Sequence, residues 1–250
     1  MFLKFLYDQL YLKSSYNMKV LIIIPAYNED ENIIKLIKTI QNEHENINII
    51  LIDDSDNFLT KQNIENYKFS NLKYIKREMK MGRGSAIRHG FEYAIKNSFD
   101  YIIEMDSDCS HDPNEIKFLL QKIINKNYDL IIGSRYLKGS KIVGWPLKRK
   151  VFSKLANLLA QFLFGFDISD YTNGFRIYSN RSINELLKYE IKNNGFIYLT
   201  ETLIILKKKN YRIGEYPTIF INRKLGSSSV RLKEIINSLF GIFKIKFRKI

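Results

Sequence analysis

The chain has 250 residues, of which 45% are hydrophobic, and this length and composition are typical of one globular domain with its own core. Its one cysteine excludes an internal disulfide, and the lack of an uninterrupted apolar run of about 18 residues predicts no transmembrane helix. The formal net charge is +14, and residues 203–250 alone hold 12 Lys or Arg against 2 Glu. This excess favours an anionic partner: a membrane surface, a nucleic acid or a phosphorylated substrate.

Residues 1–17 precede the first predicted strand. Lys4 and Asp8 interrupt their apolar character and no small-residue cleavage site follows, so they do not read as a secretory signal. We expect an N-terminal extension over residues 1–17, one domain over 18–230 and a basic amphipathic helix over 231–250.

Short apolar segments along the first half are predicted to be buried parallel strands, because each is a run of β-formers bounded by polar residues. They are residues 19–24, which should end at Pro25, and residues 47–52, 72–76, 101–105 and 129–132. Segments with apolar residues at helical spacing alternate with them. This alternation predicts an α/β protein with a doubly wound, Rossmann-like, mostly parallel sheet flanked by helices.

Two acids, Asp106 and Asp108, follow the strand at 101–105 directly. Open α/β sheets bind ligands at the carboxyl ends of their strands, and two carboxylates there suit Mg²⁺ or Mn²⁺. A solvated turn is the alternative interpretation. Asp112 is expected to be structural, because Asp112-Pro113 and Glu115 form the pattern of a helix N-cap with a capping box.

The second half is less regular. We expect a helix over residues 148–164, a loop over SDYTNGFR, a helix over 199–209 and a strand over 212–221. From residue 231 onward, apolar residues recur every three to four positions among lysines and arginines, which predicts an amphipathic helix that either packs on the domain or binds a membrane. Its apolar positions are Leu232, Ile235, Ile236, Leu239, Phe243 and Phe247.

The polar residues that follow the predicted strands indicate a binding site for an activated nucleotide together with a metal ion. A dinucleotide site is not indicated, because Gly82-Arg83-Gly84 lacks the third glycine of that motif, and no P-loop lysine motif is present. Tyr27 offers a ring for a base, and Asp54 an acceptor for a base N–H. Arginines after strands and beside glycines are candidates for phosphate contacts, namely Arg135, Arg176 and Arg223.

The sequence contains an ordered set of motifs: IIIPAYNE, LIDDSD, GRGSAIRHG, EMDSDCSHDP, GSRY, TNGFR and a final R-x-x-G-x-S. Over residues 18–235 this set resembles the dolichyl- or polyprenyl-phosphate mannosyltransferases, which are inverting glycosyltransferases of family 2 with the GT-A fold. The resemblance implies that Asp106 and Asp108 bind a metal and the donor diphosphate, with Ser110 beside them. It also implies a set of nucleoside contacts: Pro25, Tyr27, Glu29, Ile52 and Asp54.

The resemblance further implies that Arg135 and Arg223 bind phosphate groups of the donor or acceptor. Three positions depart from the family pattern. Ser55 stands where glycine is usual, Ile197 where lysine is frequent, and Ser229 where the G-x-S-K ending has lysine. Arg231 or Lys233 could replace that lysine in binding the acceptor phosphate.

The expected activity is transfer of a hexose, namely mannose from GDP-mannose, onto dolichyl or polyprenyl phosphate with inversion and with Mg²⁺ or Mn²⁺. A phosphate monoester is largely dianionic at neutral pH and needs orientation more than a general base. His89 and His111 are accordingly interpreted as helix-surface and turn residues. Such an enzyme is expected on the cytoplasmic face of a membrane, bound peripherally or through a small membrane-anchoring partner.

Alternatives stay open from the sequence alone. Within the same class they are glucosyl transfer to the same lipid, or sugar transfer to a glycan or protein. From another class, a nucleic-acid-binding module would account for the charge. That module leaves the acids at the strand ends unexplained, because they would repel phosphate without a metal, so we expect no nucleic acid partner.

Overall fold

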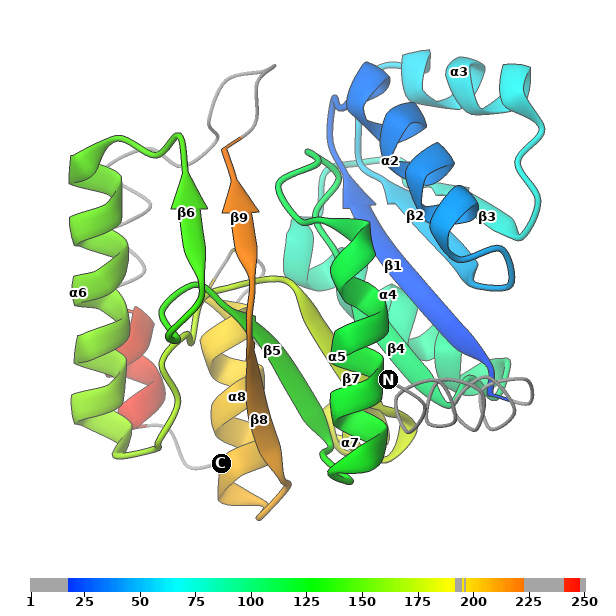
Figure 1. The fold of residues 1–250 in the computed structure, drawn as a ribbon. Coiled ribbons are helices and arrows are strands. Elements are labelled where there is room, and N and C mark those ends of the chain that lie inside the picture. The colour runs from blue at the N-terminus through cyan, green and yellow to red at the C-terminus, as the bar shows by residue number, and fades with distance from the viewer. Residues whose placement is uncertain (1–17, 192–194, 196, 223–240, 248–250) are drawn as a thin grey trace, which may run out of the picture.

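The computed structural model describes residues 18–191, 195, 197–222 and 241–247. Figure 1 shows one central sheet with helices on both faces and a smaller two-stranded sheet beside it. The strands are β1 Val20–Ala26, β2 Asn48–Asp53, β3 Leu72–Lys76, β4 Tyr101–Glu104, β5 Leu130–Ser134, β6 Lys141–Val143, β7 Arg176–Ser179, β8 Ile213–Pro217 and β9 Ile219–Ile221. The helices are α2 Asp30–Glu43, α3 Leu59–Tyr67, α4 Arg83–Lys96, the short 3-10 helix η1 Pro113–Glu115, α5 Ile116–Asn125, α6 Leu147–Phe164, α7 Asn180–Leu187 and α8 Tyr198–Lys208.

The central sheet has the strand order β3-β2-β1-β4-β7-β5-β8. All its pairs are parallel except those of β7, which lies antiparallel between β4 and β5. The predicted mostly parallel α/β sheet is therefore confirmed. Strand β7 itself was not predicted, because its first residue, Arg176, was assigned to a loop. Its inner position in the sheet shows that the buried Ile177 and Tyr178 outweigh the polar neighbours.

Strand β1 continues through Pro25, where the sequence predicted its end. Pro25 pairs with Ile52 of β2, whereas on the other side the pairing with β4 stops at Ile23 and Glu104. Beyond that point the edge of β1 needs no N–H donor, so proline fits the strand.

Residues 212–221 form two strands where one was predicted. β8 pairs with β5 in the central sheet and β9 pairs with β6 in the small sheet. The chain changes sheets at Thr218, whose N–H donates to the Ser134 carbonyl (3.0 Å). The Glu115 side chain fixes this junction, because its carboxylate accepts from the Thr218 hydroxyl and from the Ile219 N–H (3.0 Å). The predicted capping box is thus only half right: Asp112 caps η1, but Glu115 binds the junction instead of reaching back.

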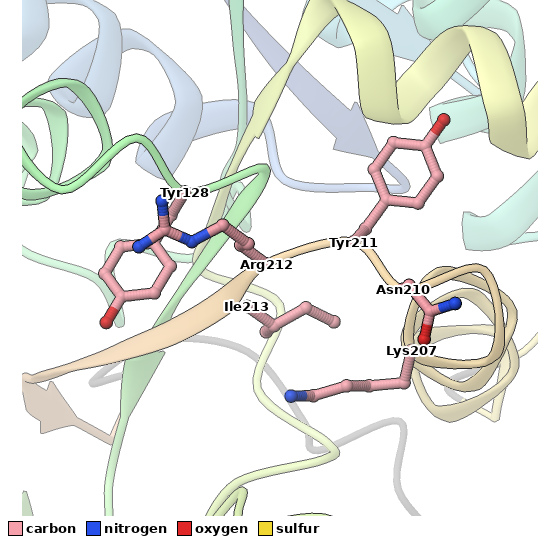
Figure 2. A pocket seen from close by; sticks show the side chains of 6 residues that line it. All are labelled: Tyr128, Lys207, Asn210, Tyr211, Arg212 and Ile213. Carbon is pink, nitrogen blue, oxygen red and sulfur yellow. The ribbon is translucent and has the colours of Figure 1, made fainter.

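The two ends of the sheet differ. A depression of about 360 Å³ lies at the amino ends of β5 and β8, and Figure 2 shows the side chains that line it. Its lining consists of Tyr128, Lys207, Asn210, Tyr211, Arg212 and Ile213. Asp54, Asp106 and Arg135, which were singled out in the sequence, follow the carboxyl ends of β2, β4 and β5, so this depression is separate from the candidate site.

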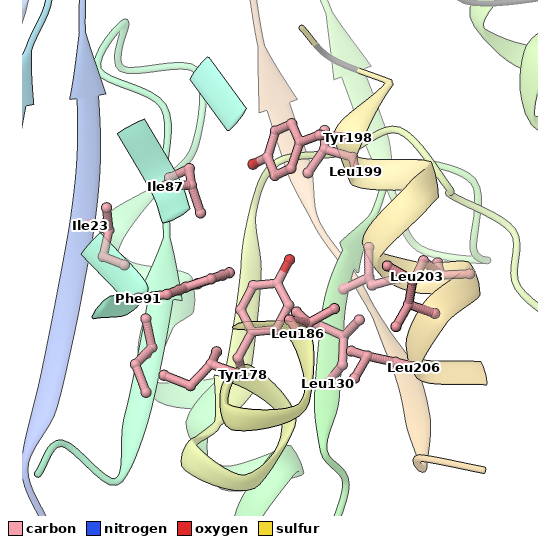
Figure 3. Close-up of a cluster of buried hydrophobic side chains, with 14 of the residues drawn as sticks. Ile23, Ile87, Phe91, Leu130, Tyr178, Leu186, Tyr198, Leu199, Leu203 and Leu206 are labelled. Atoms are coloured by element: carbon pink, nitrogen blue, oxygen red, sulfur yellow. The ribbon is translucent and has the colours of Figure 1, made fainter. Parts of the chain in front are cut away.

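The core has one cluster on each face of the sheet. Helices α4, α7 and α8 cover one face, and α2, α3 and α5 cover the other. Figure 3 shows the first cluster, in which the Phe91 ring of α4 meets the Tyr178 ring of β7 edge-on at 5.1 Å between centroids. Tyr198 joins this cluster from the start of α8, at the end nearest the candidate site.

The C-terminal helix is described only over residues 241–247, where Ile242 and Ile245 are buried in the first core cluster. The predicted apolar positions Phe243 and Phe247 are instead exposed. Over these residues the helix therefore packs on the domain through Ile242 and Ile245, while Phe243 and Phe247 remain on its outer side, so the choice between packing and membrane binding stays a prediction. None of the helices that the structure describes is long and apolar enough to span a membrane.

Candidate active site

Asp106 lies in the turn beyond β4 and is held by an arginine from α4. Its Oδ1 accepts hydrogen bonds from Arg83 Nε (3.0 Å) and Nη2 (2.6 Å). The other Arg83 nitrogen, Nη1, bonds the fully buried Glu104 and the Tyr198 hydroxyl. Burial raises the pKa of the Asp106 carboxyl, but the Arg83 charge outweighs it and holds that pKa below its ordinary value. Asp106 is therefore an ionised, oriented carboxylate.

Arg83 was quoted in the sequence only as part of GRG, and its role was missed. An arginine at a helix start carries no signal for a partner more than 20 residues away. Gly174 of the TNGFR loop shows how tight the arrangement is. A Cβ on Gly174 would lie 3.0 Å from Arg83 Cζ and 3.3 Å from Asp106 Oδ1, and closer still to Arg83 Nη2. Only glycine leaves room for the guanidinium here.

His111 was interpreted as a turn residue, and the structure buries it completely beside Asp106. Its Nδ1 accepts from the Asp106 N–H (3.3 Å), and its Nε2 lies 3.1 Å from Asn173 Oδ1. Because Asn173 donates its amide to the Gly133 carbonyl, its Oδ1 must accept from His111. One ring nitrogen accepts and the other donates, so the imidazole is neutral. Burial lowers the pKa of His111 in agreement with this, although Asp106 opposes it.

Asp108 and Ser110 complete the loop that we call the acid loop, residues 106–110. Asp108 Oδ1 accepts from the Ser110 N–H (3.1 Å). Within the described part of the chain, the buried Ser110 Oγ has no hydrogen-bond partner. An unsatisfied buried hydroxyl beside two carboxylates fits a divalent cation with oxygen ligands. The described residues contain no cluster of three or more His, Cys, Asp or Glu able to hold a metal. Protein ligands alone would therefore leave positions for phosphate oxygens and water.

The predicted base pocket lies at the carboxyl ends of β1 and β2. The Tyr27 hydroxyl donates to Asp56 Oδ2 (2.6 Å), and Lys80 Nζ lies 3.4 Å from the centre of the Tyr27 ring. Asp54 forms a two-point ion pair with Arg77 (Nη2–Oδ2 2.5 Å), with both side chains nearly buried. Arg77 was not predicted, because nothing local marks an arginine after β3 as the partner of an acid after β2.

Ser55, which departs from the family's glycine, ties this pocket together. The Ser55 hydroxyl donates a hydrogen bond to the Asp53 carboxylate, and the same hydroxyl oxygen accepts one from the Asn28 N–H (2.8 Å). Asn28 has a positive φ of 55°, and the bond from its N–H helps to hold that turn. The serine therefore links the loops after β1 and β2, which accounts for its presence.

Three other residues implied for the nucleoside lie in different settings. Pro25 is in β1, and Glu29 is at the start of α2, where its Oε2 accepts from the Asn32 amide (2.8 Å). Ile52 is fully buried in the first core cluster. A contact from the Ile52 side chain to a nucleoside is therefore not available in this structure, and the residue supports the pocket from below.

Arg135 follows β5 and is buried with Asp170 in a two-point ion pair of 2.7 and 2.8 Å. Burial raises the pKa of the Asp170 carboxyl, but Arg135 outweighs it and keeps that pKa below its ordinary value. The Arg135 guanidinium lies 5.3 and 5.7 Å from the ring centres of Trp145 and Phe220. Arg135 therefore lies in an aromatic setting, and its charge, together with that of Arg83, helps to lower the pKa of Asp106.

Arg176 is fully buried beneath the site. Its guanidinium donates to the carbonyls of Asn173 (2.9 Å), Leu199 (2.8 Å) and Tyr171 (2.9 Å). A phosphate contact is therefore not open to it, and its observed contacts shape the TNGFR loop and fasten that loop to α8. The predicted residues Arg223, Ser229, Arg231 and Lys233 lie outside the described residues. Ile197 lies at the start of α8, against Gly241 of the C-terminal helix.

The mostly parallel sheet with an acid pair at its carboxyl edge defines a GT-A fold, the class that nucleotide-sugar-dependent glycosyltransferases use. The family model described as glycosyl transferase family 2 matches residues 21–187, and the chain belongs to that family. It is a glycosyltransferase, and the predicted family, fold and enzyme class are confirmed.

Named relatives are similar over most of their length. The chain is 29% identical to polyprenol monophosphomannose synthase of Mycolicibacterium smegmatis, covering 90% of this chain and 85% of that protein. It is 29% identical to undecaprenyl-phosphate mannosyltransferase of Micrococcus luteus, covering 85% and 88%. Among solved structures, glucosyl-3-phosphoglycerate synthase of Mycobacterium tuberculosis with Mn²⁺ and UDP superposes with a TM-score of 0.69 at 16% identity, covering 93% of this chain and 80% of that one.

Proposed function

We propose that this chain transfers mannose from GDP-mannose to a polyprenyl or dolichyl phosphate, with inversion and with the help of Mg²⁺ or Mn²⁺. The observation that carries the proposal is the acid loop, with two carboxylates and the unsatisfied Ser110 hydroxyl at the carboxyl edge of the sheet. Support for the sugar and the lipid comes from the two relatives, which are named for mannose transfer to polyprenyl phosphates.

A metal would be held by Asp106, Asp108 and Ser110. Arg83 occupies Oδ1 of Asp106, whereas among the described residues Oδ2 has only His111 Nε2 nearby, at 3.8 Å and so beyond hydrogen-bond distance. Oδ2 is thus the oxygen open to a cation. When bound, the metal supplies charge neutralisation of the donor diphosphate as it leaves. A solved structure of this fold that contains Mn²⁺ and UDP together supports a divalent ion in the role.

The nucleoside would lie over the loops after β1 and β2. Tyr27 would present its ring to the base, which requires Lys80 to move or to stack on the other side. Asp54 would accept a base N–H while it keeps Arg77. Pro25 and Glu29 would border the pocket. Arg77 therefore acts as a positioning residue in this proposal.

The acceptor is a phosphate that is largely dianionic at neutral pH, so it can attack without giving up a proton to the protein. His111 fits this scheme. As a neutral, hydrogen-bonded imidazole it orients the Asp106 backbone and the Asn173 amide and does not serve as a base. Arg135 and Arg223 would bind phosphate oxygens, with Ser229 and its basic neighbours beside them.

A lipid acceptor requires the enzyme to work at a membrane surface. We propose a peripheral location on the cytoplasmic face, where the net charge of +14 favours anionic lipids and where a small anchoring partner could also bind.

A donor screen tests the proposal. Purified chain is incubated with GDP-mannose, UDP-glucose or UDP-GlcNAc, with Mg²⁺, Mn²⁺ or chelator, and with a short-chain polyprenyl phosphate. We expect a mannosyl lipid from GDP-mannose that disappears with chelator. Turnover of UDP-glucose alone would assign a glucosyl transfer, and full activity with chelator would refute the metal role.

A further inference from the structure

Helix α6 turns many of its large apolar side chains outward, whereas Leu163 and Phe164 at its end pack against the first core cluster. Its buried residues are the small or polar Ala156, Asn157 and Ala160. Five of its exposed apolar residues recur every three to four positions and form one stripe along the whole helix, which we call the α6 face: Leu147 (77% exposed), Val151 (48%), Leu155 (53%), Leu158 (49%) and Phe162 (85%). A surface helix normally does the opposite, and a continuous exposed apolar stripe marks a docking surface.

The charged residues of α6 indicate that its partner is anionic. Lys148, Lys150 and Lys154 belong to the helix, and α6 contains no Asp or Glu. Arg149 is engaged with the Trp145 ring (4.1 Å) and the Asn222 side chain (3.2 Å), so it holds the start of α6 against the small sheet. Apolar side chains flanked by lysines are the pattern of a helix that lies in the interface of an anionic lipid surface.

Both ends of α6 extend the same surface. At its start, Val143 of β6 and Ile219 and Ile221 of β9 are exposed apolar residues. At its end, Lys246 Nζ donates to the Leu163 carbonyl (2.5 Å), which places the exposed Phe247 next to α6. Figure 1 shows α6 at one edge of the molecule, with the small sheet beside its start.

We infer that the α6 face docks the enzyme peripherally on an anionic lipid membrane. A second copy of the chain is the competing occupant. A two-fold contact through α6 would bring the lysines of one copy near those of the other with no acid from either helix, and such like-charge contact opposes association. Anionic headgroups neutralise these lysines instead.

The surface adjoins the acid loop. The Ile221 N–H donates to the Ser110 carbonyl (3.0 Å), so β9, whose Ile219 and Ile221 side chains are exposed, is bonded directly to the loop with the acid pair. Docking through α6 would therefore bring a lipid-borne phosphate to the site side of the molecule. This use of the surface rests on the proposed function, whereas membrane binding itself does not.

The test is cosedimentation of the full chain with phosphatidylcholine vesicles, with and without phosphatidylglycerol, at low and high salt. Leu155→Glu/Leu158→Glu puts two acids on the α6 face. Leu59→Glu is the matched control, because Leu59 is as exposed as Leu158 (49%) but lies on α3 at the other edge of the sheet. Melting temperature and turnover of a short soluble acceptor are measured on each variant.

Wild type and Leu59→Glu should bind the anionic vesicles and release them in high salt. The α6 variant should bind at least about tenfold more weakly with an unchanged melting temperature, since it loses apolar contact and gains like-charge repulsion. Lys148→Gln/Lys154→Gln should weaken binding by about 25-fold, at about fivefold per basic residue near the surface.

Wild-type vesicle binding by the α6 variant would overturn the inference. So would a wild-type dimer that the α6 substitutions dissociate and that ignores vesicles, because the partner would then be a second copy. Loss of vesicle binding with normal turnover of the soluble acceptor supports docking. If neither the wild type nor any variant turns over the soluble acceptor, the proposed reaction is refuted, but the inference of membrane docking is not affected.

Discussion

Replacing Gly174 with alanine should disconnect Arg83 from Asp106. The added Cβ would lie 3.0 Å from Arg83 Cζ and closer to Nη2, whereas such atoms are in contact at about 3.5 Å. The guanidinium must therefore withdraw by about an ångström, away from the 2.6 Å bond to Asp106 and from the fully buried Glu104.

The size of the effect follows from what these groups lose. A hydrogen bond to a charged group contributes about 1.5–3 kcal/mol, and Glu104 keeps its bond from the Tyr178 hydroxyl (3.2 Å). We expect a loss of about 2 kcal/mol in the free energy of unfolding, or about 4–8 °C in melting temperature for a chain of this size. Because Asp106 is no longer oriented, turnover should fall by about a hundredfold, the loss that a 1 Å misplacement can cause.

Thermal melts and steady-state kinetics check both values. Gly195→Ala is the control, because a Cβ there meets no atom of the described residues within 4 Å. Arg83→Lys provides a second arm: lysine lacks Nη2, so in that background Gly174→Ala should cost less, and the two substitutions should not be additive. A Gly174→Ala variant with wild-type stability and turnover, or costs that simply add, would refute the proposed clash.

Asp108→Asn should abolish turnover and weaken Mn²⁺ binding measured by calorimetry. The melting temperature should stay close to wild type, because asparagine keeps the Oδ1 that accepts from the Ser110 N–H; unchanged Mn²⁺ affinity would move the metal site elsewhere. Asp54→Asn should lower the free energy of unfolding by about 2 kcal/mol, because it weakens the ion pair with Arg77. It should also raise the KM for the donor more than it lowers kcat. If the variant is destabilised but its KM is unchanged, Asp54 has only a structural role. Asp170→Asn should destabilise by about 3 kcal/mol at neutral pH by leaving Arg135 buried without its partner. Because the folded-state pKa of Asp170 is depressed, its contribution is present above the unfolded pKa and is lost as pH falls through the folded pKa. The gap between wild type and Asp170→Asn in denaturant melts should therefore shrink in acid, and a gap independent of pH would contradict this account.

The amino-acid sequence alone determined the parallel strands of the first half of the chain and the edge of the sheet at which the site lies, but not the inner strand β7. The buried strands around Ile22 and Ile50 are continuous apolar runs in the sequence. Such a run predicts a strand without knowledge of its neighbours, because a strand buried on both faces needs no polar residue. Asp54, Asp106 and Asp108 follow such runs directly, so their position at the carboxyl edge needed no knowledge of long-range contacts. The ordered motifs then restricted the chain to family 2.

The tertiary structure alone decided which charges meet. Arg83 and Asp106, like Arg77 and Asp54, are separated by 23 residues, and the residues near each arginine do not specify which carboxylate lies beside it in space. The need for glycine at position 174 arises from the Arg83 side chain of another element.

Burial was likewise decided by packing. The apolar pattern of α6 and of the C-terminal helix is the same whether the large residues face inward or outward. Only the assembled domain shows that Ile242 and Ile245 find a core surface, whereas Leu147 and Phe162 do not. The hydrophobic effect drives both groups out of water, but it acts on whatever apolar surface is within reach, and that surface exists only once the chain has folded.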